Sequence, residues 1–449
     1  MRLTILGGGG FRVPLVYGAL LDARSPVTDV VLYDTDGARL AVSGQVLRAQ
    51  AREAEEAQRA PRVHVVTDLD EALTGTDLVF SAIRVGGLAG RIHDERVALD
   101  LGVLGQETVG PGGIAFGLRT VPEAVRIAER IRRLAPKAWV VNFTNPAGMI
   151  TRAMQTVLGD RVVGICDSPI ALTRRAARAL GLAPAQVAPD YVGLNHLGWL
   201  RGLRADGRDL LPRLLADDAA LLGLEEGRLF GPDWLRTIGA LPNEYLYYFY
   251  CAREALAGIA GAQRTRGEYL REQQEAYYAA VEADPGRALA TWRQARAERD
   301  ASYMQEARAV SESRDQADLD AGGYEGVALT LMAALRGGEP ARMILGVRNG
   351  TCVPGLPADS VVEVPCLADA AGVTALAPTN PPSGHPLGLM QQVAEVEALT
   401  VHSALTGDDA AAVAAFALHP LVGSVATARA LLAGYRAAIP EVDAVFAER

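Results

Sequence analysis

The stretch RLTILGGGGFRVPLVYGALLDARSPVTDVVLYD (2–34) contains a strand-like run, a glycine cluster, a helical pattern and a second apolar run. The glycines occupy 7–10, and Pro14 suits the first turn of the helix that follows. Glycines at such a turn let backbone N–H groups approach a pyrophosphate, whose charge the helix N-terminus stabilises. The stretch therefore predicts a βαβ unit that binds a dinucleotide.

This loop and the acid that ends the second apolar run supply the candidate cofactor contacts. Asp34 is expected to accept hydrogen bonds from ribose hydroxyls, which favours NAD over NADP. The other predicted cofactor residues are Gly7, Gly9, Gly10, Phe11 and Arg12. The glycine fingerprint is imperfect, because its third position falls on Arg12. A tight strand–helix turn without a ligand is the alternative interpretation.

The rest of the chain divides into two parts. Further strand-like runs occupy 63–66, 77–81, 139–143 and 162–165, and a helical pattern covers 122–134. Strands that alternate with helices predict an α/β domain with a parallel sheet. From about 196 the pattern changes to charged helical stretches (266–281, 287–306), a small β region (343–365), two helical segments (393–405, 410–432) and a proline-rich, loop-like stretch (372–388). We therefore predict two domains that share a cleft.

The composition is that of a globular chain and excludes some partners. The 449 residues carry a formal net charge of −9, which gives no support to nucleic-acid binding. Lys137 is the only lysine, a bias that codon usage in a GC-rich genome explains. Without CxxC spacing or a signal-peptide layout, we expect reduced thiols and a cytoplasmic protein. The uncharged stretch 410–428 contains Pro420 and predicts two helices with a break, not a membrane span.

Six segments are richer in polar residues than core packing requires. They are IRVGGLAGRIHDE (83–95), GQETVGPGGIAFGLRT (105–120), NFTNPAG (142–148), GICDSP (164–169), YVGLNHLGWL (191–200) and LPNEYLYYFY (241–250). With these motifs the chain resembles the family 4 glycoside hydrolases, glycosidases that depend on NAD and a divalent metal ion. The pattern is nearest to that of members acting on 6-phosphoglucosides.

The resemblance extends from residue 2 to about 435 and implies a fold. We expect an N-terminal Rossmann-like domain with a doubly wound parallel sheet (1–195). An α+β domain for substrate, metal and oligomerisation follows (196–449), in an architecture like that of lactate and malate dehydrogenases. Homodimers or homotetramers are implied.

The resemblance also implies metal ligands and catalytic groups. Cys166 matches the Cys of a GxCxxP turn and His196 the His of a GLNH motif, which bind a divalent ion, expected to be Mn²⁺. Tyr245 matches the base of a PxxYLxYY motif, whose last Tyr is Phe249 here. Asp167 is a candidate to protonate the leaving oxygen. By residue type alone, a lone Cys is often a buried small hydrophobe, and tyrosines at helical spacing usually pack in a core.

Substrate contacts are implied in two of these segments and in a further TRxE segment at 265–268. Asn145 matches the Asn of an NxTNP motif, near metal and substrate, and Arg266 the Arg of a TRxE segment at the distal end of the substrate. Arg84 and Arg91 are the other candidates for an anionic group at C6. Ordinary ion pairs are the alternative for all three arginines, and Glu107 is as well suited to ordering its glycine-rich loop as to chemistry.

The implied mechanism explains why a hydrolase would need NAD. Hydride leaves C3 of the sugar for NAD, and the resulting ketone acidifies the proton at C2, which Tyr245 removes while the metal polarises the C3 oxygen. The leaving group then departs from C1 by elimination, water adds, and the hydride returns to C3. NAD is therefore a recycled cofactor.

Several alternatives stay open at the level of sequence. The Gly–Gly pair after Val85 narrowly favours 6-phospho-β-glucosides, whereas Asp167 fits the 6-phospho-α-glucosidase type. A uronate or a sulfonate such as sulfoquinovose is an alternative anionic sugar. Outside the family, the candidates are a lactate- or malate-type NAD dehydrogenase and a protein that binds NAD without catalysis.

Overall fold

One large mixed sheet forms the centre of the molecule. The computed structural model describes residues 1–22, 25–301 and 323–447. In the described chain the sheet has 13 strands, in the order β10-β8-β7-β12-β11-β6-β5-β4-β1-β2-β3, with β9 and β13 at its side. The strands of the N-terminal part are β1 (Arg2–Leu6), β2 (Asp29–Tyr33), β3 (Arg62–Val66), β4 (Leu78–Ser81), β5 (Trp139–Asn142) and β6 (Val162–Gly164).

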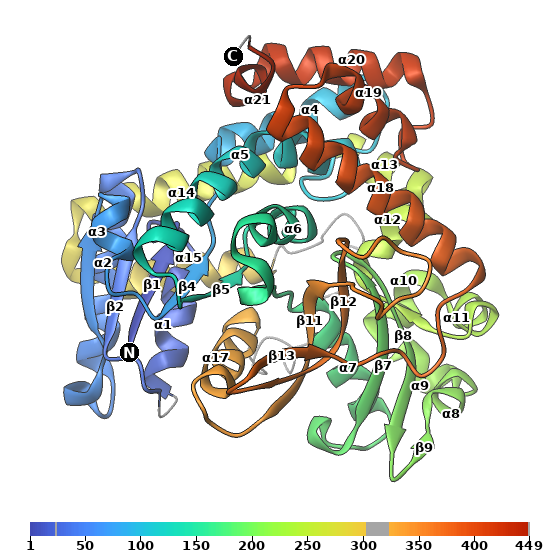
Figure 1. The fold of residues 1–449 in the computed structure, drawn as a ribbon, viewed down its shortest axis with the longest axis horizontal. Coiled ribbons are helices and arrows are strands. Elements are labelled where there is room, and N and C mark those ends of the chain that lie inside the picture. The colour runs from blue at the N-terminus through green and yellow to red at the C-terminus, as the bar shows by residue number, and fades with distance from the viewer. Residues whose placement is uncertain (23–24, 302–322, 448–449) are drawn as a thin grey trace.

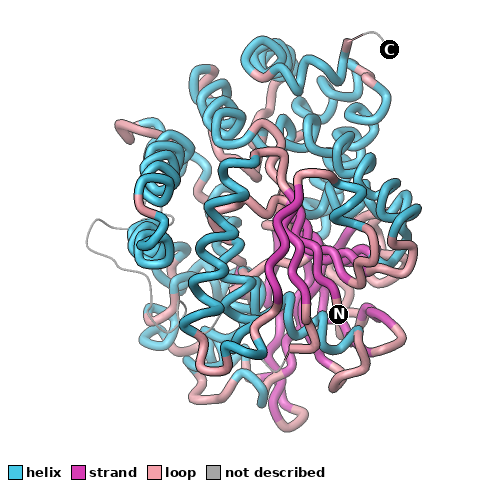
Figure 2. The backbone as a smooth tube through the Cα atoms, turned by 90° about the vertical axis from the view of Figure 1, so that its left-hand side faces the viewer, coloured by secondary structure: helices cyan, strands magenta, loops and turns pink. Residues whose placement is uncertain are grey.

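These six strands are parallel and follow the order 3-2-1-4-5-6 of a doubly wound nucleotide-binding sheet. Their side chains are mostly Val, Leu and Ile because helices cover both faces of a parallel sheet. Figure 2 shows the strands with helices on both sides. The predicted α/β class with a parallel sheet is confirmed.

The sheet continues without a break into the second half of the chain. Its strands there are antiparallel: β7 (Ala188–Leu194), β8 (Leu197–Ala205), β9 (Arg208–Asp209), β10 (Leu241–Pro242), β11 (Ala341–Arg348), β12 (Val361–Asp369) and β13 (Gly372–Ala375). The boundary expected between 195 and 196 falls in the tight turn between β7 and β8, which pair with each other.

Two groups of helices enclose the N-terminal strands (Figure 1). They are α1 (Val13–Asp22), α2 (Gly37–Glu53), α3 (Leu69–Leu73), α4 (Gly87–Asp100), α5 (Pro111–Leu134), α6 (Ala147–Leu158) and α7 (Ser168–Ala179). Side chains of α1 and α7 belong to one core cluster, and those of α3, α5 and α6 to another. The loop between β1 and α1 therefore lies at the edge of a sheet that has a packed core on each face.

Helices of the second half complete both layers. They are α8 (Leu211–Leu215), α9 (Asp218–Leu222), α10 (Glu225–Phe230), α11 (Pro232–Ile238), α12 (Tyr247–Tyr250), α13 (Ala252–Ala260), α14 (Arg266–Ala283), α15 (Ala288–Ala301), α17 (Tyr324–Leu335), α18 (Gly384–Thr406), α19 (Asp409–Leu418), α20 (Val425–Ala438) and α21 (Pro440–Phe446). Chain-distant segments meet here: α14 and α15 pack beside α2 and α4.

Some sequence-based boundaries need correction. The helix expected at 122–134 begins at Pro111, and Pro122 lies inside it. The stretch 372–388, expected to be loop-like, contains β13 and the start of α18, because Pro386 lies in the first turn, where a helix tolerates proline. The break between α19 and α20 is as predicted at Pro420, and no described helix has the length and apolarity needed to cross a bilayer. Of the stretch 287–306, residues 302–306 lie outside the described part.

A buried ion pair fastens α4 to α5, and breaking it should destabilise the fold. Both nitrogens at the fork of Arg119 donate to Asp94 at 2.7 Å, with both side chains fully buried. Asp94→Asn leaves the guanidinium charge without a counter-charge, a loss of about 3–5 kcal/mol. We expect the Tm to fall by several degrees in thermal unfolding. Glu53→Gln, which breaks the exposed pair with Arg293, is the control and should leave the Tm almost unchanged.

Candidate active site

A cavity of about 1310 Å³ opens at the carboxyl ends of the parallel strands. Ligands of doubly wound folds bind at this edge, outside the strand ends. Every site residue expected from the sequence lines this cavity: Gly7, Gly9, Gly10, Phe11, Arg12, Asp34, Arg84, Arg91, Asn145, Cys166, Asp167, His196, Tyr245 and Arg266. The structure therefore brings together segments that are up to 260 residues apart, although their individual roles remain predictions.

The loop between β1 and α1, residues 7–12, forms one end of the cavity and is here called the glycine loop. Gly7 has a φ of +81°, and a Cβ there would lie 2.4 Å from the Ala82 carbonyl oxygen, so only glycine fits. The Gly9 N–H donates to Asp34 Oδ2 at 2.9 Å, and the Asp36 N–H donates to Oδ1 at 3.0 Å. A carboxylate has about four acceptor positions, so Asp34 keeps capacity for ribose hydroxyls.

Cys166 and His196 come from neighbouring parts of the sheet. Cys166 follows β6, and His196 occupies the turn between β7 and β8 with a φ of +62°, unusual for a side chain of this size. Thr108 Oγ1 lies 3.0 Å from His196 Nδ1, which leaves Nε2 as the nitrogen available to a ligand. Burial lowers the pKa of His196 to about 4, so the imidazole is neutral, as a metal ligand must be.

The surroundings of Cys166 favour a bound cation. Burial raises the pKa of the Cys166 thiol well above its usual range, and the carboxyl groups of Glu363 and Asp167 raise it further. A thiolate here needs a positive charge beside it. The described residues contain no group of three or more His, Cys, Asp or Glu side chains that could hold a metal ion.

Tyr245 lies against the imidazole of His196. The two rings are stacked, with centroids 3.6 Å apart and an angle of 4° between their planes. Next to it, Glu244 accepts a hydrogen bond of 2.6 Å from Ser168 Oγ, which ties the Tyr245 turn to the turn that carries Cys166. Burial raises the pKa of Glu244 to about 7. The predicted base, Tyr245, and both metal-ligand candidates therefore form one unit.

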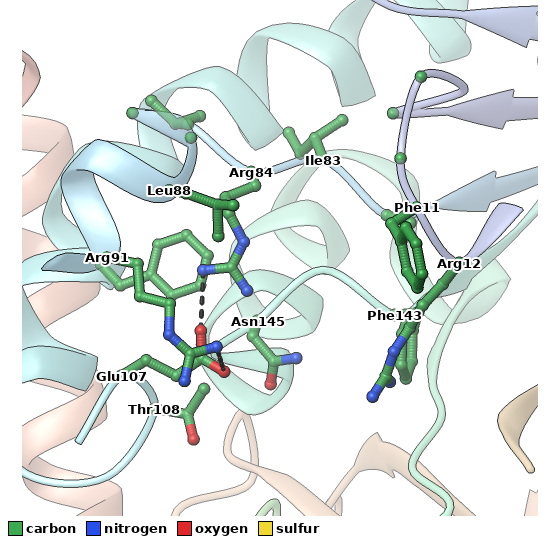
Figure 3. A pocket seen from close by; sticks show the side chains of 18 of the residues that line it. Phe11, Arg12, Ile83, Arg84, Leu88, Arg91, Glu107, Thr108, Phe143 and Asn145 are labelled. Atoms are coloured by element: carbon green, nitrogen blue, oxygen red, sulfur yellow. Dashed lines mark ion pairs between the residues drawn. The ribbon is translucent and has the colours of Figure 1, made fainter. Parts of the chain in front are cut away.

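Arg84, Arg91 and Glu107 form a charged group in the cavity lining (Figure 3). Arg84 and Arg91 both reach Glu107, at 2.9 and 2.7 Å, and Arg91 also pairs with Glu95 at 2.9 Å. The second oxygen of Glu95 accepts from the Gly267 N–H at 2.7 Å, at the start of α14. The ion pairs considered as an alternative therefore exist for Arg84 and Arg91, and Glu107 orders both guanidinium groups.

Arg299 on α15 was not predicted as a site residue from the sequence. It is partly buried in the cavity lining with Arg12 and Arg266, and desolvation together with these positive neighbours lowers its pKa well below the usual range. Arg266 Nη2 donates to the Arg299 carbonyl oxygen at 3.3 Å. Like charges gathered in a cavity indicate an anion site. No signal in the sequence distinguishes Arg299 from the other arginines of its charged helix.

Asn145 completes this group of polar side chains. Its Oδ1 is buried and accepts no hydrogen bond from the described part of the chain. Because an unsatisfied buried acceptor is unfavourable, this atom fits a ligand hydroxyl or a cation as its partner. Figure 3 shows Asn145 facing the space that Arg84 and Arg91 border.

Comparison with known proteins gives the same picture. The family model "Family 4 glycosyl hydrolase" matches residues 2–182, and "Family 4 glycosyl hydrolase C-terminal domain" matches 191–422. A probable 6-phospho-beta-glucosidase of Bacillus subtilis is 29% identical over 442 residues, covering 96% of this chain and 95% of that protein. A 6-phospho-alpha-glucosidase of Leptotrichia buccalis is 28% identical over 453 residues, covering 96% of each.

A solved structure has the same fold over its whole length. The 6-phospho-beta glucosidase of Thermotoga maritima, crystallised with NAD and glucose-6-phosphate, matches with a TM-score of 0.80 and 25% identity, over 98% of this chain and 99% of that one. The two family models together cover most of the sequence, in the order that the motifs predict. The chain therefore belongs to glycosyl hydrolase family 4.

Proposed function

We propose that this protein hydrolyses 6-phosphoglucosides, with the β anomer preferred, and uses NAD and a divalent metal ion, expected to be Mn²⁺. The observation that carries the proposal is the single cavity in which the glycine loop, the Cys166–His196–Tyr245 unit and the arginine cluster meet. Family membership makes the chain a glycosidase. The names of its relatives support a phosphorylated glucoside as substrate.

The residues present fit both cofactors. A glycine loop with Asp34 beside it suits a dinucleotide. A neutral His196, with Cys166 among carboxyl groups where a thiolate would need a cation beside it, suits a divalent metal. When bound, these groups supply reversible acceptance of hydride from C3 of the sugar and Lewis acidity at the C3 oxygen.

The chain's own groups then perform the proton chemistry. Tyr245 takes the proton from C2, and its stacking on His196 fixes the ring beside the metal-ligand candidates. Thr108 in turn fixes His196 through the bond to Nδ1. Asp167 lines the same cavity next to Cys166 and is the proposed donor to the leaving oxygen. Arg266, with Arg299 beside it, holds the 6-phosphate through charge-assisted hydrogen bonds.

Two observations bear on the anomer. The pair Gly86–Gly87, typical of the β members that the chain resembles, has a φ of +77° and +56°, so both positions favour glycine. Asp167, by contrast, supports the α anomer as the second candidate, because it lines the cavity and an acid after the Cys is the pattern of the 6-phospho-α-glucosidase type. An uronate or a sulfonate at C6 is the alternative anion.

A substrate panel tests the proposal. Nitrophenyl α- and β-glucosides, each with and without a 6-phosphate, are assayed with NAD and Mn²⁺. We expect turnover of the phosphorylated β compound. If only the phosphorylated α compound is turned over, the preferred anomer is α and not β. If the unphosphorylated glucosides are turned over equally fast, the proposed phosphate site is refuted.

Native mass measurement tests the expected homodimer or homotetramer.

Removal of Arg299 tests the anion site. Arg299→Gln is expected to raise the KM for the 6-phosphoglucoside about 10- to 100-fold, with a smaller effect on kcat, because one charge-assisted hydrogen bond contributes about 1.5–3 kcal/mol. Arg296→Gln, on the same helix but paired with Asp300 at 3.3 Å outside the cavity, is the matched control. Equal effects of the two substitutions would remove Arg299 from the site.

A further inference from the structure

Three aromatic side chains from the second half of the chain hold the backbone of the glycine loop. Tyr278 Oη donates to the Gly9 carbonyl oxygen at 2.7 Å. Trp292 Nε1 donates to the Phe11 carbonyl at 2.9 Å, and Tyr324 Oη donates to the Arg12 carbonyl at 3.0 Å. The donors lie between 269 and 312 residues away from the loop in sequence.

Two side chains of the glycine loop, those of Phe11 and Arg12, are also held by packing contacts. Phe11 is part of a small buried cluster with residues of α2, α14 and α15, and its ring meets Tyr277 edge to face at 5.3 Å. Arg12 lies over the rings of Phe143 and Tyr324. The loop is therefore fixed by elements outside its own βαβ unit.

These bonds decide which way the loop peptides face. In a trans peptide the C=O and the next N–H point in opposite directions. Since the Phe11 carbonyl accepts from the buried Trp292, the Arg12 N–H points away from α15. The N–H groups of the other two anchored peptides, those of Gly10 and Val13, donate to carbonyls of the loop itself, so Tyr278 and Tyr324 hold the turn rather than aim an N–H group at the ligand. Backbone N–H groups are what a glycine loop offers to a pyrophosphate, so the orientation of its peptides controls its affinity.

We propose that Tyr278, Trp292 and Tyr324 are positioning residues that preset the glycine loop for the dinucleotide. The inference rests on the proposed use of NAD and adds that α14, α15 and α17 help to build the nucleotide site. A preset loop loses less conformational freedom on binding, so these donors strengthen binding of the cofactor. They hold the loop and take no part in the chemistry.

The experiment measures the Kd of NAD⁺ by isothermal titration with the full-length protein. Tyr278→Phe removes one hydrogen bond and keeps the ring, so we expect the Kd to rise about 3- to 10-fold. Tyr277→Phe is the matched control: it removes a neighbouring hydroxyl from the same cluster that bonds none of the described loop carbonyls, and should leave the Kd unchanged.

A second variant separates positioning from direct contact. Tyr278 lines the cavity, whereas Trp292 is not among the described residues that line it. Trp292→Phe should therefore raise the Kd of NAD⁺ by at least as much as Tyr278→Phe does. Because Trp292 is outside the described lining, that rise would come from the loop and not from a lost contact with the ligand. The Kd of glucose 6-phosphate should stay within about twofold in both variants, which general damage to the fold would not allow.

The outcomes are distinguishable from failure of the proposed function. If the unaltered protein does not bind NAD⁺, the proposed function fails and the inference falls with it. Binding by the unaltered protein with an unchanged Kd in Tyr278→Phe and Trp292→Phe would overturn the inference alone. If the Kd of glucose 6-phosphate rose as much as the Kd of NAD⁺, the three donors would be ordinary packing residues and not positioning residues for the dinucleotide.

Discussion

Tyr245→Phe is expected to lower kcat about 10²- to 10⁴-fold, the range for loss of a general acid or base, on 6-phosphoglucosides with poor leaving groups. The substitution keeps the ring stacked on His196 and removes only the hydroxyl that is proposed to take the C2 proton. The Kd of NAD⁺ should not change, because the residues proposed to hold the dinucleotide, the glycine loop and Asp34, are unaltered. Steady-state rates with an alkyl 6-phosphoglucoside, together with titration of NAD⁺, measure both quantities.

Tyr250→Phe is the control for this substitution. Tyr250 ends α12, the helix that begins two residues after Tyr245, and lies outside the described lining of the cavity, where it accepts a hydrogen bond from Trp199. Its kcat should stay within a few-fold of the unaltered value. Unimpaired turnover by Tyr245→Phe would show that another group removes the proton.

Removal of divalent cations should have an effect of similar size. We expect chelation to lower activity about 100-fold or more, because a Lewis acid at the C3 oxygen contributes several kcal/mol to stabilising negative charge. Added Mn²⁺ should restore the rate, and a reductant should be required, because oxidation of Cys166 removes a ligand. The rate is measured before dialysis against a chelator, after it, and after Mn²⁺ is returned.

His196→Ala, a substitution of the other predicted metal ligand, tests the same metal dependence. The variant should require much more Mn²⁺ for half-maximal activity, whereas His402→Ala, at an exposed position next to Asp408, should not. Full activity after exhaustive chelation would contradict the metal-dependent scheme.

Much of the fold and of the site could be predicted from local pattern. The apolar runs VVLY (30–33) and WVVN (139–142) are strands because both faces of the sheet are covered. Gly7 and Asp34 have fixed positions relative to the first two strands, so their proximity follows from the βαβ unit. The motifs that the chain shares with family 4 then predicted Cys166, His196 and Tyr245 as site residues.

Contacts between distant segments could not be predicted in this way. Arg299 and Trp292 lie on α15, whose charged, alanine-rich sequence resembles that of a solvated helix. Only the packing of α15 against α2 and α14 turns these two side chains toward the loop and the cavity. The pairing of Glu107 with Arg84 and Arg91 likewise depends on how α4 meets the loop before α5.

Comparison of aglycone release with NADH formation tests the central claim most directly. A 6-phosphoglucoside of nitrophenol is turned over with NAD⁺ and Mn²⁺, and nitrophenol and NADH are followed in the same sample. We predict release of nitrophenol that depends on added NAD⁺, with NADH staying far below one equivalent, because the hydride returns to C3 in each cycle. Stoichiometric accumulation of NADH would identify a dehydrogenase, and full release by protein freed of NAD⁺ would contradict the redox mechanism.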